Sequence, residues 1–175
     1  MNGSGTNSDA FVAQAVQCIP RLRRYARALT GDPAAADDLV QDALERALLK
    51  QDLWRRGSDM RAWLFTVMHN VFINQVRATA APGRLVPLDD MVAHAPQMPD
   101  ADRLEIRDLD AALQMLPEAQ RMVVLLVGLE QMSYEETAQV LDVPVGTVMS
   151  RLSRGREQLR RLLQGARPAS LKVVK

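Results

Sequence analysis

A short capped helix, a forced turn and a longer amphipathic helix follow one another in residues 133–164, and this pattern limits the fold most. Ser133 and Glu136 have the spacing of a capping box, in which each side chain accepts a hydrogen bond from the other residue's backbone N–H. The proline of Asp142-Val143-Pro144 cannot continue the first helix, so a turn is expected there and a second helix directly after it. Two helices joined by so short a turn predict a helix-turn-helix.

The second helix of this motif has one apolar face and one polar, basic face. Its apolar side chains recur at helical spacing and are expected to pack inward; they are Val145, Val148, Leu152, Leu159 and Leu162. The opposite face can bind base edges and phosphates of DNA, and the residues expected to do so are Thr147, Ser150, Arg151, Arg154, Arg156 and Gln158. Arg151 and Arg154 are best placed for bases or nearby phosphates. A helical hairpin whose basic face is only solvated is the alternative.

The N-terminal half of the chain is expected to form three long helices, over residues 10–29, 34–50 and 60–78. Thr30-Gly31-Asp32-Pro33 separates the first two, because glycine favours a helix end and proline a helix start. Residues 52–59 are expected to form a loop. The third helix is apolar around most of its circumference, so it is expected to be largely buried, with Trp63 and Phe65 in the core.

Residues 81–102 are rich in proline and lack helical periodicity, which predicts a flexible linker. This linker divides the chain into an N-terminal domain, residues 1–80, and a C-terminal domain, residues 103–175. Aromatic residues make up only 4% of the chain and hydrophobic residues 47%, so the core is expected to be aliphatic, which favours helices. The expected fold class is all-α, with two small helical domains.

Charge is segregated along the chain although the net charge is only +1. Residues 89–142 carry a net charge of −9, whereas residues 143–175 carry +7. A concentrated basic segment indicates a local site for a polyanion, and a solvated basic tail is the alternative.

Several classes of function are disfavoured by what the chain lacks. Cys18 is the only cysteine, so neither an intrachain disulfide nor a cysteine metal site is expected, and His69 and His94 are too far apart in sequence to suggest a metal cluster. A hydrolase or nuclease is disfavoured because no nucleophile–base arrangement and no glycine-rich phosphate loop is visible. No cofactor is expected. The longest apolar run, Met122–Val127, is too short to span a bilayer and no signal peptide is visible, so a cytoplasmic location is expected.

Several sequence stretches in both domains resemble the extracytoplasmic-function (ECF) sigma factors of bacterial RNA polymerase. In the C-terminal domain the resemblance is carried by residues 116–121, 133–138 and 145–156, parts of which GerE/LuxR-type regulators share. In the N-terminal domain it is carried by residues 37–47 and 61–70, which those regulators lack. The resemblance covers nearly the whole chain and implies sigma domains two and four without the extra domains of housekeeping sigma factors.

The resemblance implies that the chain is a non-catalytic subunit that binds core RNA polymerase and directs initiation at promoters. Contacts to the clamp helices of the largest polymerase subunit are expected from Asp38, Leu39, Gln41, Asp42 and Glu45. Four of these residues, all except Leu39, lie on one helical face. Without the resemblance, this face would be interpreted as a solvated acidic surface. A contact of the C-terminal domain with the flap of the second subunit is also expected.

The same resemblance assigns promoter contacts to both domains. Recognition and melting of the minus-ten element are expected from Trp54, Arg55, Arg56, Asn70, Asn74 and Arg77, with the loop around Trp54 holding a flipped base. The helix-turn-helix is expected to read the minus-thirty-five element. His69 and Asn74 stand where arginine and aspartate are common, which leaves the exact promoter bases open.

The resemblance also implies a regulatory partner, and one competing hypothesis stays open. Sigma factors of this class are commonly held inactive by an anti-sigma protein, so such a partner is expected, with the chain either free in the cytoplasm or held at the membrane through it. The competing hypothesis is a GerE/LuxR-type regulator that binds DNA tightly without polymerase.

Overall fold

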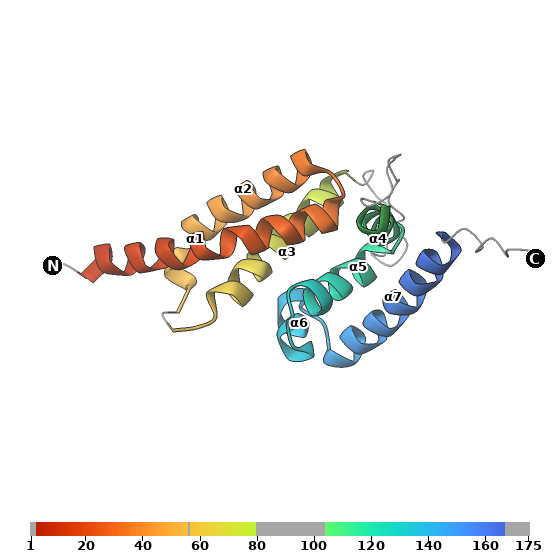
Figure 1. Cartoon of the computed structure of the whole chain (residues 1–175). Coiled ribbons are helices and arrows are strands. Elements are labelled where there is room, and N and C mark those ends of the chain that lie inside the picture. Colours follow the sequence, from red (N-terminus) through yellow and green to blue (C-terminus); the bar gives the residue numbers. More distant parts are fainter. Residues whose placement is uncertain (1–2, 56, 80–103, 167–175) are drawn as a thin grey trace, which may run out of the picture.

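The computed structural model describes residues 3–55, 57–79 and 104–166, and within these ranges the chain is helical throughout with short connections (Figure 1). The N-terminal domain contains α1 (Gly3–Thr30), α2 (Pro33–Leu49), a short 3-10 turn, η1 (Gln51–Leu53), and α3 (Met60–Thr79). The C-terminal domain contains α4 (Leu104–Gln114), α5 (Glu118–Val124), a π-helical turn, η3 (Leu125–Leu129), α6 (Tyr134–Leu141) and α7 (Val145–Ala166). The all-α fold class is confirmed. The expected linker, residues 81–102, lies outside the described residues.

The boundary between α1 and α2 follows the local signals in the sequence. Gly31 has φ of +71°, a conformation that glycine adopts without strain, and its N–H donates to the carbonyl of Arg27 at 2.9 Å. Asp32 caps α2, because its carboxylate accepts hydrogen bonds from the N–H groups of Ala34 and Ala35. Pro33 follows in the first turn. The first helix nevertheless begins earlier than expected, at Gly3 rather than near residue 10.

The N-terminal domain is held together by α3, which buries apolar side chains on more than one side. Phe65 packs edge-on against Tyr25 with ring centroids 5.1 Å apart, and Trp63 packs edge-on against Phe11 at 5.7 Å. Met68 and Leu64 are also fully buried. The expected burial of the third helix is therefore confirmed, and the core positions of Phe65 and, at its edge, Trp63 agree with the sequence.

The helix-turn-helix has the predicted geometry. Ser133 Oγ accepts from the N–H of Glu136 at 3.0 Å, and Glu136 Oε2 accepts from the N–H of Ser133 at 2.7 Å, so both halves of the capping box are present. Asp142 ends α6 with φ of +52°, and α7 begins at Val145. Gly155 allows α7 to approach α5 closely, since a Cβ atom there would lie 2.8 Å from Val124 Cγ2.

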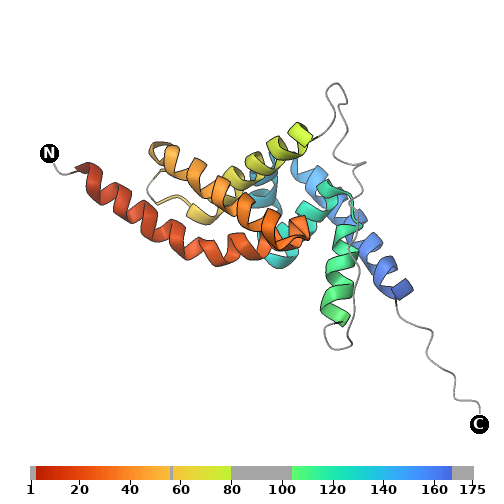
Figure 2. The same cartoon turned by 90° about the horizontal axis from the view of Figure 1, so that it is seen from above.

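The two domains pack against each other (Figures 1 and 2). The C-terminal end of α1 meets α4, α5 and η3, and α3 meets α6. Arg121, fully buried in the C-terminal domain, donates to the Leu29 carbonyl at 2.9 Å, and Gln114 donates to the Ala28 carbonyl at 2.8 Å. The last turn of α1 is therefore capped by side chains of the other domain.

Candidate polymerase and promoter interfaces

The exposed side of α2 presents the acidic surface that the sequence predicts. Its polar members are all exposed: Asp38, Gln41, Asp42 and Glu45. Gln41 donates to Glu45 Oε1 at 3.1 Å, and Gln75 of α3 donates to Asp42 Oδ2 at 2.8 Å. The surface thus extends from α2 onto the neighbouring helix α3.

Leu39 does not belong to this surface, and the expectation that it contacts polymerase is corrected. Its side chain is only 1% exposed and packs in the core of the N-terminal domain. The physical reason is helical spacing, because Leu39 lies three residues after Ala36 and four before Ala43, both of which face inward.

Three exposed leucines at the end of α2 were missed in the sequence. Leu48, Leu49 and Leu53 lie on α2 and η1 beside the acidic surface, and Leu49 is 87% exposed. The spacing of the apolar residues in α2 predicts that Leu48 faces the core, but its side chain is 47% exposed. Leu49 falls off that repeat, and Leu53 lies beyond the end of α2. Exposed leucines that are this close together suggest a contact with another protein.

The loop after α2 only partly matches the expected binding site for a flipped base. Trp54 is 4% exposed and packs edge-on against Phe11 with ring centroids 5.8 Å apart, so its assignment to a base contact is corrected. Burying the large indole ring in the core is favourable because it removes apolar surface from water, so the ring packs inward although its residue lies in a loop. Arg55 is exposed, whereas Arg56 lies outside the described residues.

On α3 the structure brings together the other residues expected at the minus-ten element. Asn70, Asn74 and Arg77 are all exposed and follow one another at spacings of four and three, so they form one polar line along the helix. Asn74 also borders a groove between α2 and α3 that Asp42 and Glu45 line on the other side. The candidate polymerase surface and the candidate DNA surface are therefore adjacent.

His69 lies next to this line, where α3 meets the helix-turn-helix. Burial lowers the pKa of His69 to about 4; the nearby carboxylate of Asp142 opposes this shift, and Arg151 and Arg77 add to it. The imidazole is therefore neutral at physiological pH. The charges around it come from both domains.

The exposed face of α7 is turned relative to the predicted one. Thr147, Ser150 and Arg151 are only partly exposed, and the Ser150 hydroxyl donates to the Thr147 carbonyl at 3.0 Å. Gln158 is also partly exposed and donates to the Met115 carbonyl at 3.5 Å. Arg154 and Arg156 are exposed as expected.

Further along α7, two arginines are paired within the helix. Arg160 and Arg161 lie 2.8 Å and 2.9 Å from the carboxylate oxygens of Glu157. Hydrogen bonds from these arginines hold the pKa of Glu157 below its usual value. Before these paired arginines, the exposed residues of α7 are Gly146, Met149, Ser153, Arg154 and Arg156.

A network of ion pairs and hydrogen bonds joins the domains near α6. Arg24 Nη2 lies 2.8 Å from Glu130 Oε1, and Glu130 has a fully buried side chain. Arg61 donates to the Glu130 carbonyl at 3.1 Å and lies 3.4 Å from Glu136 Oε1. No local pattern of residues predicts these pairs.

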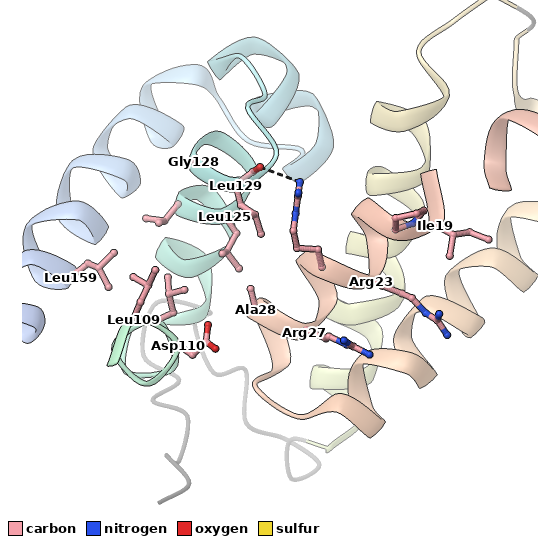
Figure 3. Close-up of a pocket in the computed structure, with 14 residues that line it drawn as sticks. Ile19, Arg23, Arg27, Ala28, Leu109, Asp110, Leu125, Gly128, Leu129 and Leu159 are labelled. Carbon is pink, nitrogen blue, oxygen red and sulfur yellow. Dashed lines mark hydrogen bonds between the residues drawn. The ribbon is translucent and has the colours of Figure 1, made fainter. Parts of the chain in front are cut away.

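A cavity of about 780 Å³ opens between α1 and the C-terminal domain (Figure 3). Leu109, Leu125 and Leu129 line one side, with Asp110 beside them. Ala28 of α1 lies opposite, and Arg23 and Arg27 edge the cavity with their guanidinium groups turned away from the leucines. We call this site the interdomain groove. A largely apolar groove edged by arginines fits an amphipathic segment with acidic residues.

In the part of the chain that the structure describes, no group of three or more His, Cys, Asp and Glu side chains could hold a metal ion. None of the described helices is both long and apolar enough to cross a membrane.

Comparison with known proteins agrees with both domains. The family described as the Sigma2 domain of PhyR matches residues 15–69, and the family described as Sigma-70, region 4 matches residues 106–159. The ECF RNA polymerase sigma factor EcfG of Rhodopseudomonas palustris is 36% identical over 158 residues, which are 89% of this chain and 86% of that protein. The chain belongs to the ECF sigma factor family. ECF sigma factors bind core RNA polymerase and direct initiation at promoters, and this is the function of the chain.

Two solved structures are similar to the chain over nearly its whole length. The sigma factor RpoE of Bartonella quintana, in complex with the anti-sigma factor NepR, is 35% identical, with a TM-score of 0.71 over 90% of this chain and 99% of that chain. CnrH, in complex with the cytosolic domain of CnrY, is 25% identical, with a TM-score of 0.69 over 93% of this chain and 96% of that chain.

Proposed function

We propose that this ECF sigma factor divides its work between three surfaces. The acidic surface of α2 docks on the clamp helices of core polymerase, α3 and the exposed Arg55 contact the minus-ten element, and the start of α7 reads the minus-thirty-five element. The chain acts in the cytoplasm as a non-catalytic subunit. The observation that carries the proposal is the presence, in one chain, of an exposed acidic helix face and an exposed basic helix face on different domains.

The polymerase contact combines charge with apolar area. Asp38 and Asp42 would supply charge, which favours association rate and specificity. Leu49 and Leu53 would supply buried apolar area, which favours affinity. Such a contact is expected to weaken with added salt but not to vanish, because its apolar part is not screened.

Binding of the labelled chain to bacterial core RNA polymerase tests this surface. The Asp38→Ala/Asp42→Ala variant should lose most of its affinity at moderate salt. A variant with Asp9→Ala and Glu135→Ala, which removes two exposed carboxylates elsewhere, should bind like the wild type. Equal affinity for the Asp38/Asp42 variant and the control variant would contradict the assignment.

The interdomain groove is proposed as the docking site of an anti-sigma protein. One structural relative, RpoE of Bartonella quintana, was solved with its anti-sigma factor NepR, and the groove offers apolar and basic side chains to an acidic amphipathic segment. Purified NepR of Bartonella quintana is a suitable probe. It should bind the wild type, and Arg27→Glu and Leu109→Glu should weaken binding; unchanged binding by these variants, or none by the wild type, would contradict the proposal.

A further inference from the structure

Met149 is a conspicuous exposed residue on the helix-turn-helix. Its side chain is 53% exposed, and among residues 134–164, all described by the structure, it is the one large hydrophobic side chain with such exposure. The core of the motif is complete without it, because Val148 and Leu152 on the adjacent face are buried. Packing therefore does not explain a methionine at this position.

The surroundings of Met149 leave it accessible along the helix. Its neighbours on the same face are Gly146, three residues before, and Ser153, four residues after, and both are small and exposed. A Cβ atom added at Gly146 would meet nothing within 4 Å, so no other part of the described chain covers this face. Small flanking residues allow the backbone of α7 to come close to a bound surface, with Met149 projecting from it.

The position of Met149 is that of a base-reading residue. In a helix-turn-helix the first turns of the second helix reach the base edges in the major groove, and Met149 lies in the second turn of α7. Ser150, which follows it, uses its hydroxyl within the helix. Arg154 and Arg156 continue the exposed surface and are suited to phosphates or guanine.

Only one base carries an apolar group in the major groove, which is the C5 methyl group of thymine. Methionine is flexible and polarisable, so its thioether can adapt to a methyl group. We propose that Met149 is a specificity-determining residue that reads the methyl group of a thymine in the minus-thirty-five element. The inference rests on the proposed placement of α7 at that element.

Uracil differs from thymine only in lacking this methyl group, so replacing one thymine by uracil removes the proposed contact and nothing else. The full chain is bound to bacterial core polymerase, and a promoter fragment is obtained by in vitro selection with this holoenzyme. Each thymine of the minus-thirty-five element, on either strand, is then replaced by uracil one at a time. For the wild type, one position is expected to weaken binding about fourfold, the effect of one buried methyl group.

Variants decide whether Met149 makes this contact. Met149→Ala should weaken binding to the thymine fragment and should lose sensitivity to uracil at that position, whereas Met149→Leu should keep part of the sensitivity. Met115→Ala, which truncates another exposed methionine in the C-terminal domain, should behave like the wild type. Circular dichroism would show that each variant is folded.

The outcomes also separate this inference from the proposed function. Tolerance of uracil at every position by the wild type, or unchanged sensitivity in Met149→Ala, would overturn the role of Met149. Arg154→Ala should weaken binding to every fragment if α7 lies on the minus-thirty-five element. If Arg154→Ala binds normally as well, the placement of α7 itself is wrong.

Discussion

Arg24 of α1 and Glu130, which follows η3, form an ion pair of 2.8 Å that joins the two domains. The Glu130 side chain is fully buried while Arg24 is half exposed. Arg24→Ala therefore leaves a buried carboxylate without its cation, and a loss of about 1–2 kcal/mol in the free energy of unfolding is expected.

Urea unfolding measures this loss, and the chain provides a matched control. Arg23 pairs with Asp37 at 3.5 Å, but both side chains are about half exposed, so Arg23→Ala should change stability by less than about 0.5 kcal/mol. Equal losses of stability in the two variants would contradict the idea that the burial of Glu130 makes its ion pair contribute more to the free energy of unfolding.

Two glycines with positive φ allow backbone strain to be separated from a steric clash. Gly31 has φ of +71° and Gly57 has +88°. A Cβ atom at Gly31 would lie 2.7 Å from Gln114 Cδ, whereas nothing lies within 4 Å of one at Gly57. Gly57→Ala should cost about 1–2 kcal/mol for strain alone, and Gly31→Ala should cost clearly more.

A second substitution tests whether the extra cost comes from the interdomain contact. Gln114→Ala removes the clashing side chain, so adding Gly31→Ala to it should cost only as much as Gly57→Ala does in the wild type. Thermal or urea unfolding of the wild type, the two single variants and the double variant forms the required cycle. Full additivity of Gly31→Ala and Gln114→Ala would show that the residues do not meet in solution.

His69 gives the domain contact a dependence on pH. Its pKa falls from 6.5 to about 4 on folding, so the unfolded chain binds the proton more readily than the folded chain. The stability contributed by neutral His69 is present above about pH 6.5 and is lost as the pH falls towards 4, by roughly 3 kcal/mol in total. Stability measured against pH for the wild type and His69→Gln should diverge in this window and run parallel above it. If the two curves of unfolding free energy against pH run parallel throughout, His69 is exposed to water and its pKa is not lowered by burial.

Leu49 provides a test of the apolar part of the polymerase contact. Because Leu49 is 87% exposed, Leu49→Ser should leave the stability of the free chain nearly unchanged. Its affinity for core polymerase should fall about tenfold if the side chain becomes buried there. Val16→Ser, at another exposed apolar position on α1, should not affect binding; the same loss in both variants would indicate a nonspecific effect.

The sequence predicted those features that depend on neighbouring residues. The capping box of Ser133 and Glu136 and the helix boundary at Gly31 and Asp32 need only a few adjacent positions, and both were correct. Leu39 was expected at the polymerase contact from the family resemblance, whereas the spacing of the apolar residues in α2 places it in the core, where the structure has it. Trp54 could not be placed from its loop, because its burial depends on Phe11, which lies 43 residues earlier.

The contacts between the two domains could not be predicted from the pattern of neighbouring residues. Arg121 and Leu29 are 92 residues apart, and Arg24 and Glu130 are 106 apart. A buried arginine and a surface arginine look alike in sequence, and only the packed structure separates them. The turned face of α7 has the same origin, because the packing of α7 on α4, α5 and α6 sets which side chains are exposed.

Promoter-directed transcription in vitro would show whether the chain acts as a sigma factor. Core polymerase alone should start at no defined site on a selected promoter, and addition of the chain should produce one discrete transcript. The Asp38→Ala/Asp42→Ala variant should lose it through polymerase binding, and Arg154→Ala through promoter binding. Tight, sequence-specific binding of the chain to this DNA without polymerase, together with no discrete transcript in its presence, would contradict the account.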